Sequence, residues 1–379
     1  MHRLLLLFMS IVLFLSSTAV IALTLVPSPP RINASSYLVM DYNSGRLVVN
    51  ENADKRVEPA SLTKIMTVYI AAREIAAGNI KLDDKVHISE KAWRMTGSRM
   101  FIEVNEQVTV EELLHGIIIQ SGNDASVAMA EHIAGDEDVF AQIMNQQAKT
   151  LGMVNTNFAN STGLPHPDHY TTAMDLTLLA RALIRDYPEV YAMHSMKEFT
   201  FNGIKQTNRN NMLWRDESVD GIKTGHTESA GYCLVASARR GDMRLISVVM
   251  GANGENARIN MTQALLSYAF RFFETHKLYA ADQVIQTGRI WKGDRESVDL
   301  GVNQDLYITI PKGTYKQLDA SIELEPDIRA PIDAGEVKGT LIVKLEGQEL
   351  VKQSLITLQS VGPGGLLDRL TDDVILLFQ

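Results

Sequence analysis

The stretch Pro59-Ala60-Ser61-Leu62-Thr63-Lys64 places a serine three residues before a lysine. Proline fits the first turn of a helix, and the mostly apolar run Leu62 to Ala77 is free of breakers until Gly78. The spacing predicts that Ser61 and Lys64 lie one turn apart on one face, at the start of a helix. A hydroxyl beside an amine is a candidate nucleophile and base, although Ser-x-x-Lys arises by chance about once in a chain of this length.

Two further short elements could complete such a site. Ser121-Gly122-Asn123 interrupts a helical region, and Lys223-Thr224-Gly225 ends a strand-like run. Each is common on its own, in an ordinary loop or at an edge strand with a turn. Together with the Ser61 turn they are divided among a helix start, an interhelical loop and a strand edge. Three such elements can converge on one cleft between an α/β layer and a helical layer.

The elements that would position these residues change in type along the chain. A hairpin is followed by a mostly helical region, Leu82 to Tyr187, then by a three-stranded meander crossed by a helix, and past His276 by a small all-β unit. The predicted strands are Ser36–Asp41, Arg46–Asn50, Asp220–Thr224, Gly231–Ala238, Arg244–Met250, Val298–Ile310, Lys316–Leu324, Val337–Leu345 and Leu350–Leu358. The predicted helices are Leu62–Ala77, one beginning at the capping box Thr109-x-x-Glu112, Ala125–Ile133 closed by Gly135, Val139–Leu151, Met174–Ile184 capped by Thr172, and Met261–Glu274.

Composition narrows the class of protein. A chain of 379 residues has a two-domain length, and its net charge of −9 argues against a nucleic-acid partner. The single cysteine, Cys233, excludes an internal disulfide. It falls in a predicted strand, so we interpret it as a packed core thiol and not as a nucleophile.

Both ends of the chain carry apolar segments. Arg3, an apolar run from Leu4 to about Leu15 and small residues have the layout of a secretory signal, with cleavage after Ala19 or Ala22. The apolar character continues to Val26, which is long enough for an uncleaved anchor, and either alternative means export. At the other end, residues 366–379 predict an amphipathic helix. Peripheral membrane contact there competes with a solvated tail, because its three aspartates would be repelled by anionic lipid.

Further residues extend the pattern beyond the three short elements. They are Asn208-Arg209-Asn210, Asp220-Gly221-Ile222-Lys223-Thr224-Gly225-His226-Thr227, Arg244-Leu245-Ile246-Ser247 and Phe270-Arg271-Phe272-Phe273-Glu274. With them, nearly the whole mature chain resembles the serine penicillin-binding proteins, and among these the small D-alanyl-D-alanine carboxypeptidases. The resemblance implies a signal or anchor over 1–26 and an α/β penicillin-binding/β-lactamase-like domain (antiparallel sheet plus helical subdomain) over 31–275. A small all-β sandwich domain over 276–361 and an amphipathic tail over 362–379 would follow.

The resemblance also implies a role for each site residue. Ser61 would attack, Lys64 would act as the base, and Ser121 would relay the proton to the leaving amine. The substrate-binding residues would be Asn123 for the amide, Arg209, Lys223 and Thr224 for the terminal carboxylate, and Gly225 with His226, whose N–H would form an oxyanion hole with that of Ser61. A free lysine has a pKa of about 10.4, so the pKa of Lys64 must be depressed. Burial would do this, and so would Lys223 as a second cation.

The implied reaction is hydrolysis of the terminal D-Ala-D-Ala bond of peptidoglycan stem pentapeptides through a Ser61 acyl-enzyme. It would take place in the periplasm, at the outer face of the cytoplasmic membrane. β-Lactam antibiotics mimic this substrate and would acylate Ser61. We expect no cofactor and no metal. The segment His166-Pro167-Asp168-His169 is interpreted as a loop, since prolines lie in and beside it and no third ligand stands at helical spacing.

Three alternatives on the same fold remain. A weak β-lactamase would need a Glu-x-x-Leu-Asn, which is missing between Asn160 and Thr172. A transpeptidase or D,D-endopeptidase is disfavoured because no large domain precedes Ser61 in this sequence. A catalytically silent penicillin-binding sensor would show an eroded motif, and all three are intact. One departure is Thr162, where relatives can carry a histidine before Gly-Leu, which bears on deacylation.

Overall fold

The computed structural model describes residues 26–377. The predicted signal or anchor therefore lies outside the described residues, apart from Val26. Within residues 26–377 no helix has the length and apolar character needed to cross a membrane.

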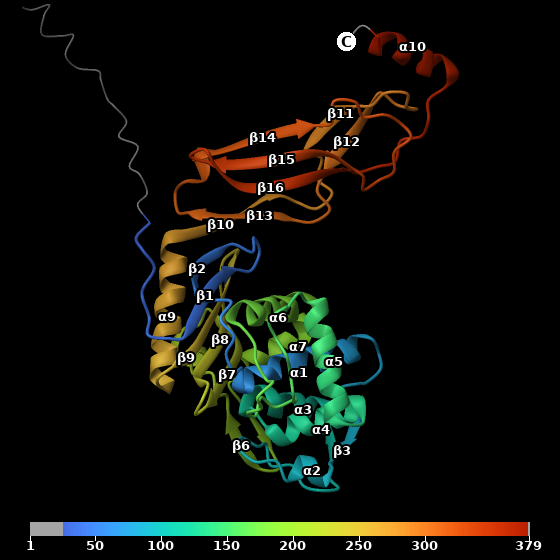
Figure 1. Cartoon of the computed structure of the whole chain (residues 1–379). Coiled ribbons are helices and arrows are strands. Elements are labelled where there is room, and N and C mark those ends of the chain that lie inside the picture. The colour runs from blue at the N-terminus through green and yellow to red at the C-terminus, as the bar shows by residue number, and fades with distance from the viewer. Residues whose placement is uncertain (1–25, 378–379) are drawn as a thin grey trace, which may run out of the picture.

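A five-stranded antiparallel sheet forms the middle of the larger part of the molecule (Figure 1). Its order is β2-β1-β9-β8-β7, so β7 is an edge strand of this sheet. The strands are β1 (Ser36–Asp41), β2 (Leu47–Glu51), β7 (Val219–Thr227), β8 (Gly231–Arg240) and β9 (Met243–Ala252). The predicted hairpin and meander are confirmed, and β7 extends beyond its predicted end at Thr224 to include Gly225, His226 and Thr227.

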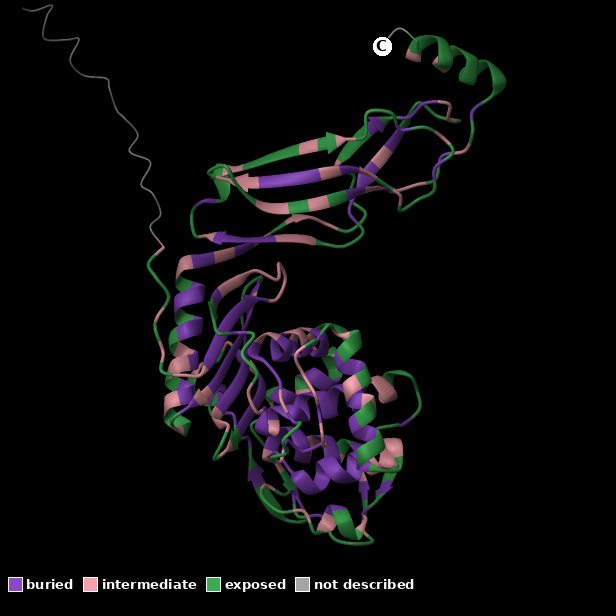
Figure 2. Cartoon of the chain, in the orientation of Figure 1, coloured by how far each residue is buried: buried purple, intermediate pink, exposed green. Residues whose placement is uncertain are grey.

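Helices cover both faces of this sheet. Helix α9 (Glu255–Phe272) packs on one face, where Leu265, Leu266 and Ala269 are fully buried. The other face carries the helical subdomain, whose buried centre is visible in Figure 2. The helices there are α1 (Lys64–Ala76), α2 (Glu90–Trp93), α3 (Val110–His115), α4 (Asn123–Ala134), α5 (Glu137–Thr150), α6 (Ala173–Asp186) and α7 (Pro188–Ala192). The short helix α8 (Met212–Arg215) lies on the α9 side, where Met212 and Leu213 join the same core as α9.

Local signals account for most helix boundaries. Thr109 and Glu112 form the predicted capping box of α3, and Thr172 caps α6. Gly135 ends α4 in the left-handed conformation, with φ of 76°. Other predictions in this region were wrong in detail. The short hairpin β3 (Lys85–His87) and β4 (Gln107–Thr109) lies inside the region predicted as helical, and α9 begins at Glu255 instead of Met261.

The C-terminal part is a sandwich of two antiparallel sheets with its own core. The two-stranded sheet β10-β13 packs against the five-stranded sheet β11-β12-β16-β15-β14. The strands are β10 (Phe273–Tyr279), β11 (Gln286–Arg289), β12 (Ser297–Gly301), β13 (Leu306–Pro311), β14 (Leu318–Leu324), β15 (Val337–Leu345) and β16 (Gln348–Thr357). The predicted strand Val298–Ile310 is in fact two, β12 and β13, in different sheets. Helix α10 (Leu366–Leu376) follows at the far end of the molecule (Figure 1).

Polar contacts join the two parts next to the point where α9 runs directly into β10. Asp41, fully buried at the end of β1, accepts a hydrogen bond from Thr275 Oγ1 of β10 at 2.7 Å. Thr309 of β13 lies within hydrogen-bond distance of Ser44 and Thr275, at 2.6 and 2.9 Å. These contacts attach the β domain to the hairpin formed by β1 and β2. Helix α10 lies at the opposite end of the β domain (Figure 1).

Candidate active site

Ser61 lies in a short 3₁₀ turn, Ala60–Thr63 (η1), immediately before α1. The sequence predicted an α-helical start here. In a 3₁₀ turn, with three residues per turn, side chains at i and i+3 are eclipsed. This geometry brings Lys64 Nζ to 3.2 Å from Ser61 Oγ, to which it donates a hydrogen bond. The serine is partly exposed, whereas the lysine has no exposed surface.

The Lys64 ammonium has two further partners. It donates to Asn123 Oδ1 at 2.8 Å and to the Thr162 carbonyl at 2.6 Å. Burial lowers the pKa of Lys64 to about 7, against the opposing charges of Asp124 and Glu137, which raise it. About half of the molecules therefore carry a neutral lysine at pH 7, compared with about one in a few thousand for a free lysine.

Asn123 and Ser121 come from the break between two helical segments. The π-helical turn Gly116–Gln120 ends at Ser121, which has a φ of 65°, and α4 then begins at Asn123. The Asn123 amide donates to the Thr96 carbonyl at 2.6 Å, so its oxygen is directed at Lys64. Ser121 is buried but, within the described part of the chain, its hydroxyl has no hydrogen bond to Ser61 or Lys64.

The third predicted element lies on β7, which packs against the Ser61 turn. Gly225 permits this approach, because a Cβ there would lie 3.1 Å from the Pro59 carbonyl oxygen and 3.3 Å from Ala60 Cβ. Lys223 is buried and donates to the Thr224 carbonyl at 3.0 Å. Its pKa is well below the usual value because of burial and the charges of Lys64 and Arg209, among others.

Burial is the main cause of the low pKa of Lys64, as the sequence predicted, and the charges of Asp124 and Glu137 oppose it. The charges of the two lysines are coupled at Lys223, since the charge of Lys64 adds to burial in lowering the pKa of Lys223.

His226 lies on β7, the charge of Arg209 acts on Lys223 of the same strand, and a third residue was missed. The centre of the exposed His226 ring lies 4.0 Å from that of Tyr232, with the rings tilted by 32°. Arg258 of α9 is buried and donates to the Gly225 carbonyl at 3.2 Å. Arg258 stands seven residues before Leu265, on the buried face of α9, and this helical spacing could have identified it from the sequence.

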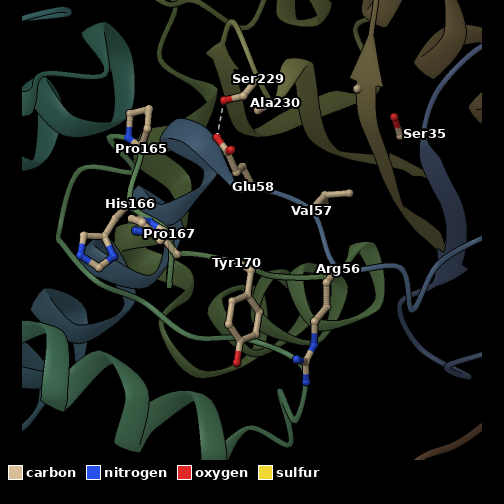
Figure 3. Close-up of a pocket in the computed structure, with 12 residues that line it drawn as sticks. Ser35, Arg56, Val57, Glu58, Pro165, His166, Pro167, Tyr170, Ser229 and Ala230 are labelled. Carbon is tan, nitrogen blue, oxygen red and sulfur yellow. Dashed lines mark hydrogen bonds between the residues drawn. The ribbon is translucent and has the colours of Figure 1, made fainter.

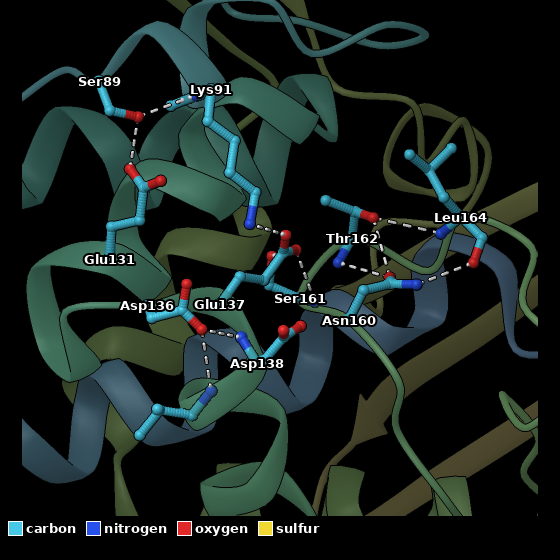
Figure 4. A network of polar contacts seen from close by, with 12 residues as sticks. Ser89, Lys91, Glu131, Asp136, Glu137, Asp138, Asn160, Ser161, Thr162 and Leu164 are labelled. Atoms are coloured by element: carbon cyan, nitrogen blue, oxygen red, sulfur yellow. Dashed lines mark hydrogen bonds and ion pairs between the residues drawn. The ribbon is translucent and has the colours of Figure 1, made fainter.

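The loop that follows α5 supplies the carbonyl partner of Lys64 (Figure 4). Asn160 Oδ1 accepts hydrogen bonds from the Thr162 and Gly163 N–H groups at 3.1 and 2.7 Å. Gly163 has a φ of 83°, and a Cβ there would lie 1.8 Å from the Ala60 carbonyl oxygen. Only glycine lets this loop lie so close to the Ser61 turn.

The buried carboxylate of Glu137 also holds this loop in place. Glu137 Oε1 accepts hydrogen bonds from the Ser161 N–H at 3.1 Å and the Ser161 hydroxyl at 2.7 Å, as Figure 4 shows. Its other oxygen lies 3.1 Å from Lys91 Nζ. Glu137 therefore fixes the position of the neighbouring Thr162 carbonyl, and through it the acceptor of Lys64.

Asp124 plays a similar part on the other side of the site. Its carboxylate, 1% exposed, accepts the backbone N–H groups of Met100 at 3.0 Å and Phe101 at 2.9 Å. These bonds hold the segment that begins at Thr96, which in turn orients the Asn123 amide. The sequence did not point to Asp124 or Glu137.

The other sequence candidates lie outside this cluster. His169 is buried, with Nε2 at 2.9 Å from Thr63 Oγ1, and burial lowers its pKa to about 4. His166 Nδ1 accepts the Asp168 N–H within its own loop. Cys233 is buried in β8, and burial raises its pKa to about 11, which suits a packed thiol.

Comparison with known proteins gives consistent matches. Residues 24–254 match the peptidase S11 family, described as D-alanyl-D-alanine carboxypeptidase, and residues 273–363 match the C-terminal domain of penicillin-binding protein 5. The D-alanyl-D-alanine carboxypeptidase DacC of Escherichia coli (strain K12) is 44% identical over 374 residues, which cover 97% of this chain and 94% of that protein.

Solved structures agree with the sequence matches. Penicillin-binding protein 5 from Haemophilus influenzae has a TM-score of 0.86 at 44% identity, covering 89% of this chain and 99% of that one. The ampicillin-bound form of penicillin-binding protein D2 from Listeria monocytogenes has a TM-score of 0.59 at 30% identity, covering 64% of this chain and 100% of that one. The second match covers less of this chain.

Proposed function

The chain belongs to the D-alanyl-D-alanine carboxypeptidase family, and on that premise we propose that Ser61 is its acylated nucleophile and Lys64 its base. It is a serine-type carboxypeptidase that removes the terminal D-alanine from peptidoglycan stem pentapeptides and binds penicillin. The observation that carries the residue assignment is the buried Lys64 Nζ, 3.2 Å from Ser61 Oγ, with a pKa near 7. A neutral amine at this distance can accept the hydroxyl proton as the acyl bond forms.

The remaining steps use the other groups of the site. Ser121, two residues before Asn123, passes the proton to the leaving D-alanine nitrogen. The N–H groups of Ser61 and His226 stabilise the oxyanion, each contributing about 3 kcal/mol. Lys223, Thr224 and Arg209 bind the terminal carboxylate, and Gly225 keeps β7 close to the Ser61 turn. A bound carboxylate would favour the charged form of Lys223, because an adjacent anion raises a lysine pKa.

The rival activities on this fold lack support at the site. A fast β-lactamase needs a carboxylate that activates water beside the acyl-serine. Among the described residues, no carboxylate hydrogen-bonds to Ser61 or Lys64, and Glu137 is turned toward Ser161 and Lys91. Deacylation in this chain then depends on Lys64 and the Thr162 loop.

The assignment is tested by following D-alanine release and labelling by fluorescent penicillin in the purified chain. We expect Ser61→Ala to lose both signals. Ser267→Ala, an exposed serine on the outer side of α9, is the matched control and should keep both. Labelling without D-alanine release in the unaltered chain would favour the sensor alternative. Labelling of the Ser61→Ala variant would remove Ser61 as nucleophile.

The location and the domain division also remain proposals. Export to the periplasm is supported by the predicted signal. The division at about residues 275–276 and 361–362 is supported by the separate hydrophobic core of the C-terminal strands.

Peripheral membrane contact is supported by α10. Its Leu366, Leu367 and Leu370 are 75%, 79% and 60% exposed. Two of the aspartates that would be repelled by anionic lipid are paired with the β domain, since Asp372 accepts the Lys292 N–H at 2.5 Å and Asp373 pairs with the Lys292 side chain. Flotation of the chain with liposomes, with and without residues 366–379, tests this contact. Equal flotation of both forms would exclude it.

A further inference from the structure

Arg258 is a buried arginine that has no part in the roles assigned above. It lies on α9 and is 5% exposed. Its Nη1 donates a hydrogen bond to the Gly225 carbonyl oxygen at 3.2 Å. Burial of a charge is costly unless the charge has partners, so a buried guanidinium directed at one carbonyl of an active-site strand requires an explanation.

The carbonyl that Arg258 contacts belongs to the same peptide group as the His226 N–H. Under the proposed function, on which this inference rests, that N–H donates to the oxyanion. The peptide bond between Gly225 and His226 is trans, so its C=O and N–H bonds point in opposite directions. Arg258 therefore lies at one end of this peptide group, and the reacting carbonyl of the substrate lies at the other.

Two neighbouring side chains hold the guanidinium in place. It lies 5.5 Å from the centre of the Tyr232 ring, and its Nη2 lies 3.3 Å from the Glu255 carboxylate. The Tyr232 ring is also 4.0 Å from the His226 ring, because these two residues are paired between β7 and β8. Tyr232 thus contacts both Arg258 and His226.

The charge of Arg258 is only partly balanced. Its one anionic partner among residues 26–377 is Glu255, whose side chain is 52% exposed, so water screens that pair. The Arg258 Nε is buried and has no hydrogen-bond partner in the same range. The field of the guanidinium extends into the cleft, because its charge is one of those that lower the pKa of Lys223.

Arg258 lies behind the cleft and does not line it. A cavity of about 680 Å³ opens beside the Ser61 turn, and its lining includes Glu58, Tyr170 and Ser229 but not Arg258 (Figure 3). Helix α9 packs on the face of the sheet opposite to the helical subdomain. The contact through which Arg258 can act on the substrate is therefore the peptide group between Gly225 and His226.

A cation beside this carbonyl strengthens the donor at the other end of the peptide group. Each peptide group carries a dipole of about 3.5 D, and its negative end is the oxygen. A positive charge there draws electron density away from the nitrogen, and hydrogen bonds linked in this way strengthen one another by about 10–30%. The bond also fixes the peptide plane, so the N–H is aimed before the oxyanion forms.

We propose that Arg258 is a positioning residue for the oxyanion hole, which orients the His226 N–H and strengthens it as a donor through the Gly225 carbonyl. The interaction grows as negative charge develops on the substrate oxygen. It should therefore contribute to kcat and leave KM nearly unchanged.

The test measures D-alanine release by Arg258→Met, whose side chain is of similar length but has neither charge nor donor. Removal of an oxyanion donor lowers kcat by about a hundredfold to a thousandfold. Arg258→Met keeps the His226 N–H, so we expect a smaller loss of about tenfold to thirtyfold in kcat, with KM within about twofold. A peptide boronic acid, which forms a tetrahedral adduct with Ser61, should lose affinity by about the same factor as kcat/KM.

A peptide ending in D-alaninamide separates this role from direct recognition of the substrate carboxylate. The loss in Arg258→Met should be equal for the peptide acid and its amide, because neither end group touches Arg258. A loss confined to the acid, or a higher KM with unchanged kcat, would overturn the proposal.

Two further variants complete the experiment. Arg258→Lys keeps the charge but not the planar fork, so kcat should fall only about threefold. If thermal unfolding shows that Arg258→Met does not fold, Arg258→Lys decides alone, and an unchanged kcat there would overturn the proposal. Arg271→Gln, at the exposed end of the same helix, is the matched control and should keep kcat. Failure of the unaltered chain to release D-alanine or to react with penicillin would instead contradict the proposed function.

Discussion

Replacing Glu137 by glutamine should change the pH dependence of the enzyme without touching any group that contacts substrate. The side chain keeps its shape, and its remaining carbonyl oxygen can still accept the two hydrogen bonds from Ser161. The negative charge that raises the pKa of Lys64 is lost. Because Lys64 must be neutral to act as a base, the acid limb of kcat/KM should move to lower pH.

The size of the shift follows from the surroundings of Glu137. A charge in direct contact shifts a pKa by one to three units, but Glu137 acts on Lys64 across Ser161 and Thr162, and Lys91 at 3.1 Å offsets part of its charge. We therefore expect a fall of about half a unit from a pKa near 7. At pH 6 the neutral fraction rises from about a tenth to about a quarter, so kcat/KM should increase about twofold to threefold. Above about pH 8.5 the two enzymes should be nearly equal.

The assay is D-alanine release from a pentapeptide between about pH 5.5 and 9, with thermal unfolding measured in parallel. Lys91→Gln removes the cation that offsets Glu137 and should move the acid limb upward. Glu131→Gln is the matched control: this carboxylate accepts the Ser89 hydroxyl at 2.7 Å and does not act on Lys64. The role of Lys64 as the titrating base would be refuted by either of two results. One is an unchanged acid limb in Glu137→Gln, and the other is a shift to lower pH in Lys91→Gln.

Three further substitutions test other contacts. Gly163→Ala should lower the free energy of unfolding by at least about 2 kcal/mol in thermal or urea unfolding, because a Cβ would lie 1.8 Å from the Ala60 carbonyl oxygen; equal stability would contradict the close packing of this loop. Asp124→Asn should lower the free energy of unfolding by about 2–3 kcal/mol in urea, because the NH₂ group of the new amide would face a backbone N–H group of Met100 or Phe101. A loss below about 0.5 kcal/mol would contradict the role of the Asp124 carboxylate in holding this segment. Arg209→Gln should lower kcat/KM about tenfold to a hundredfold for a peptide ending in a free carboxylate, and much less for its amide; equal losses would exclude carboxylate recognition.

The sequence predicted the side chains of the site better than the contacts that position them. Ser61, Lys64 and Asn123 come together, since three short elements with strong local signals carry them. The Thr162 carbonyl, by contrast, is a backbone group and has no residue-type signal. Glu137 hydrogen-bonds to Ser161, which is 24 positions away in the sequence. It also lies in the first turn of α5, where acidic residues are common because they interact favourably with the helix dipole, so the sequence contained no sign of a further role.

The elements show the same division between local and long-range information. Caps such as Thr109 and Gly135 are local, and they were located correctly. The strands β3 and β4 have three residues each and are stabilised by pairing across a loop of 19 residues, so their sequences alone show no strand period. The start of α9 was placed six residues late because Arg258 and Asn260 interrupt an apolar pattern, although Arg258 is in fact buried against β7.

A carboxylate bound at the proposed site would act on the charge state of Lys223. Burial first, and then the charges of Lys64, Arg209 and Arg258, lower the pKa of Lys223 well below its usual value. A substrate carboxylate beside Lys223 would raise that pKa, whereas an amide or a continuing peptide chain would not. Binding of a carboxylate should therefore favour the charged form of Lys223. Proton uptake on binding of a carboxylate inhibitor, measured by calorimetry in two buffers of different ionisation enthalpy, should be positive for the carboxylate and absent for its amide. Equal proton uptake for both would show that Lys223 does not respond to the carboxylate.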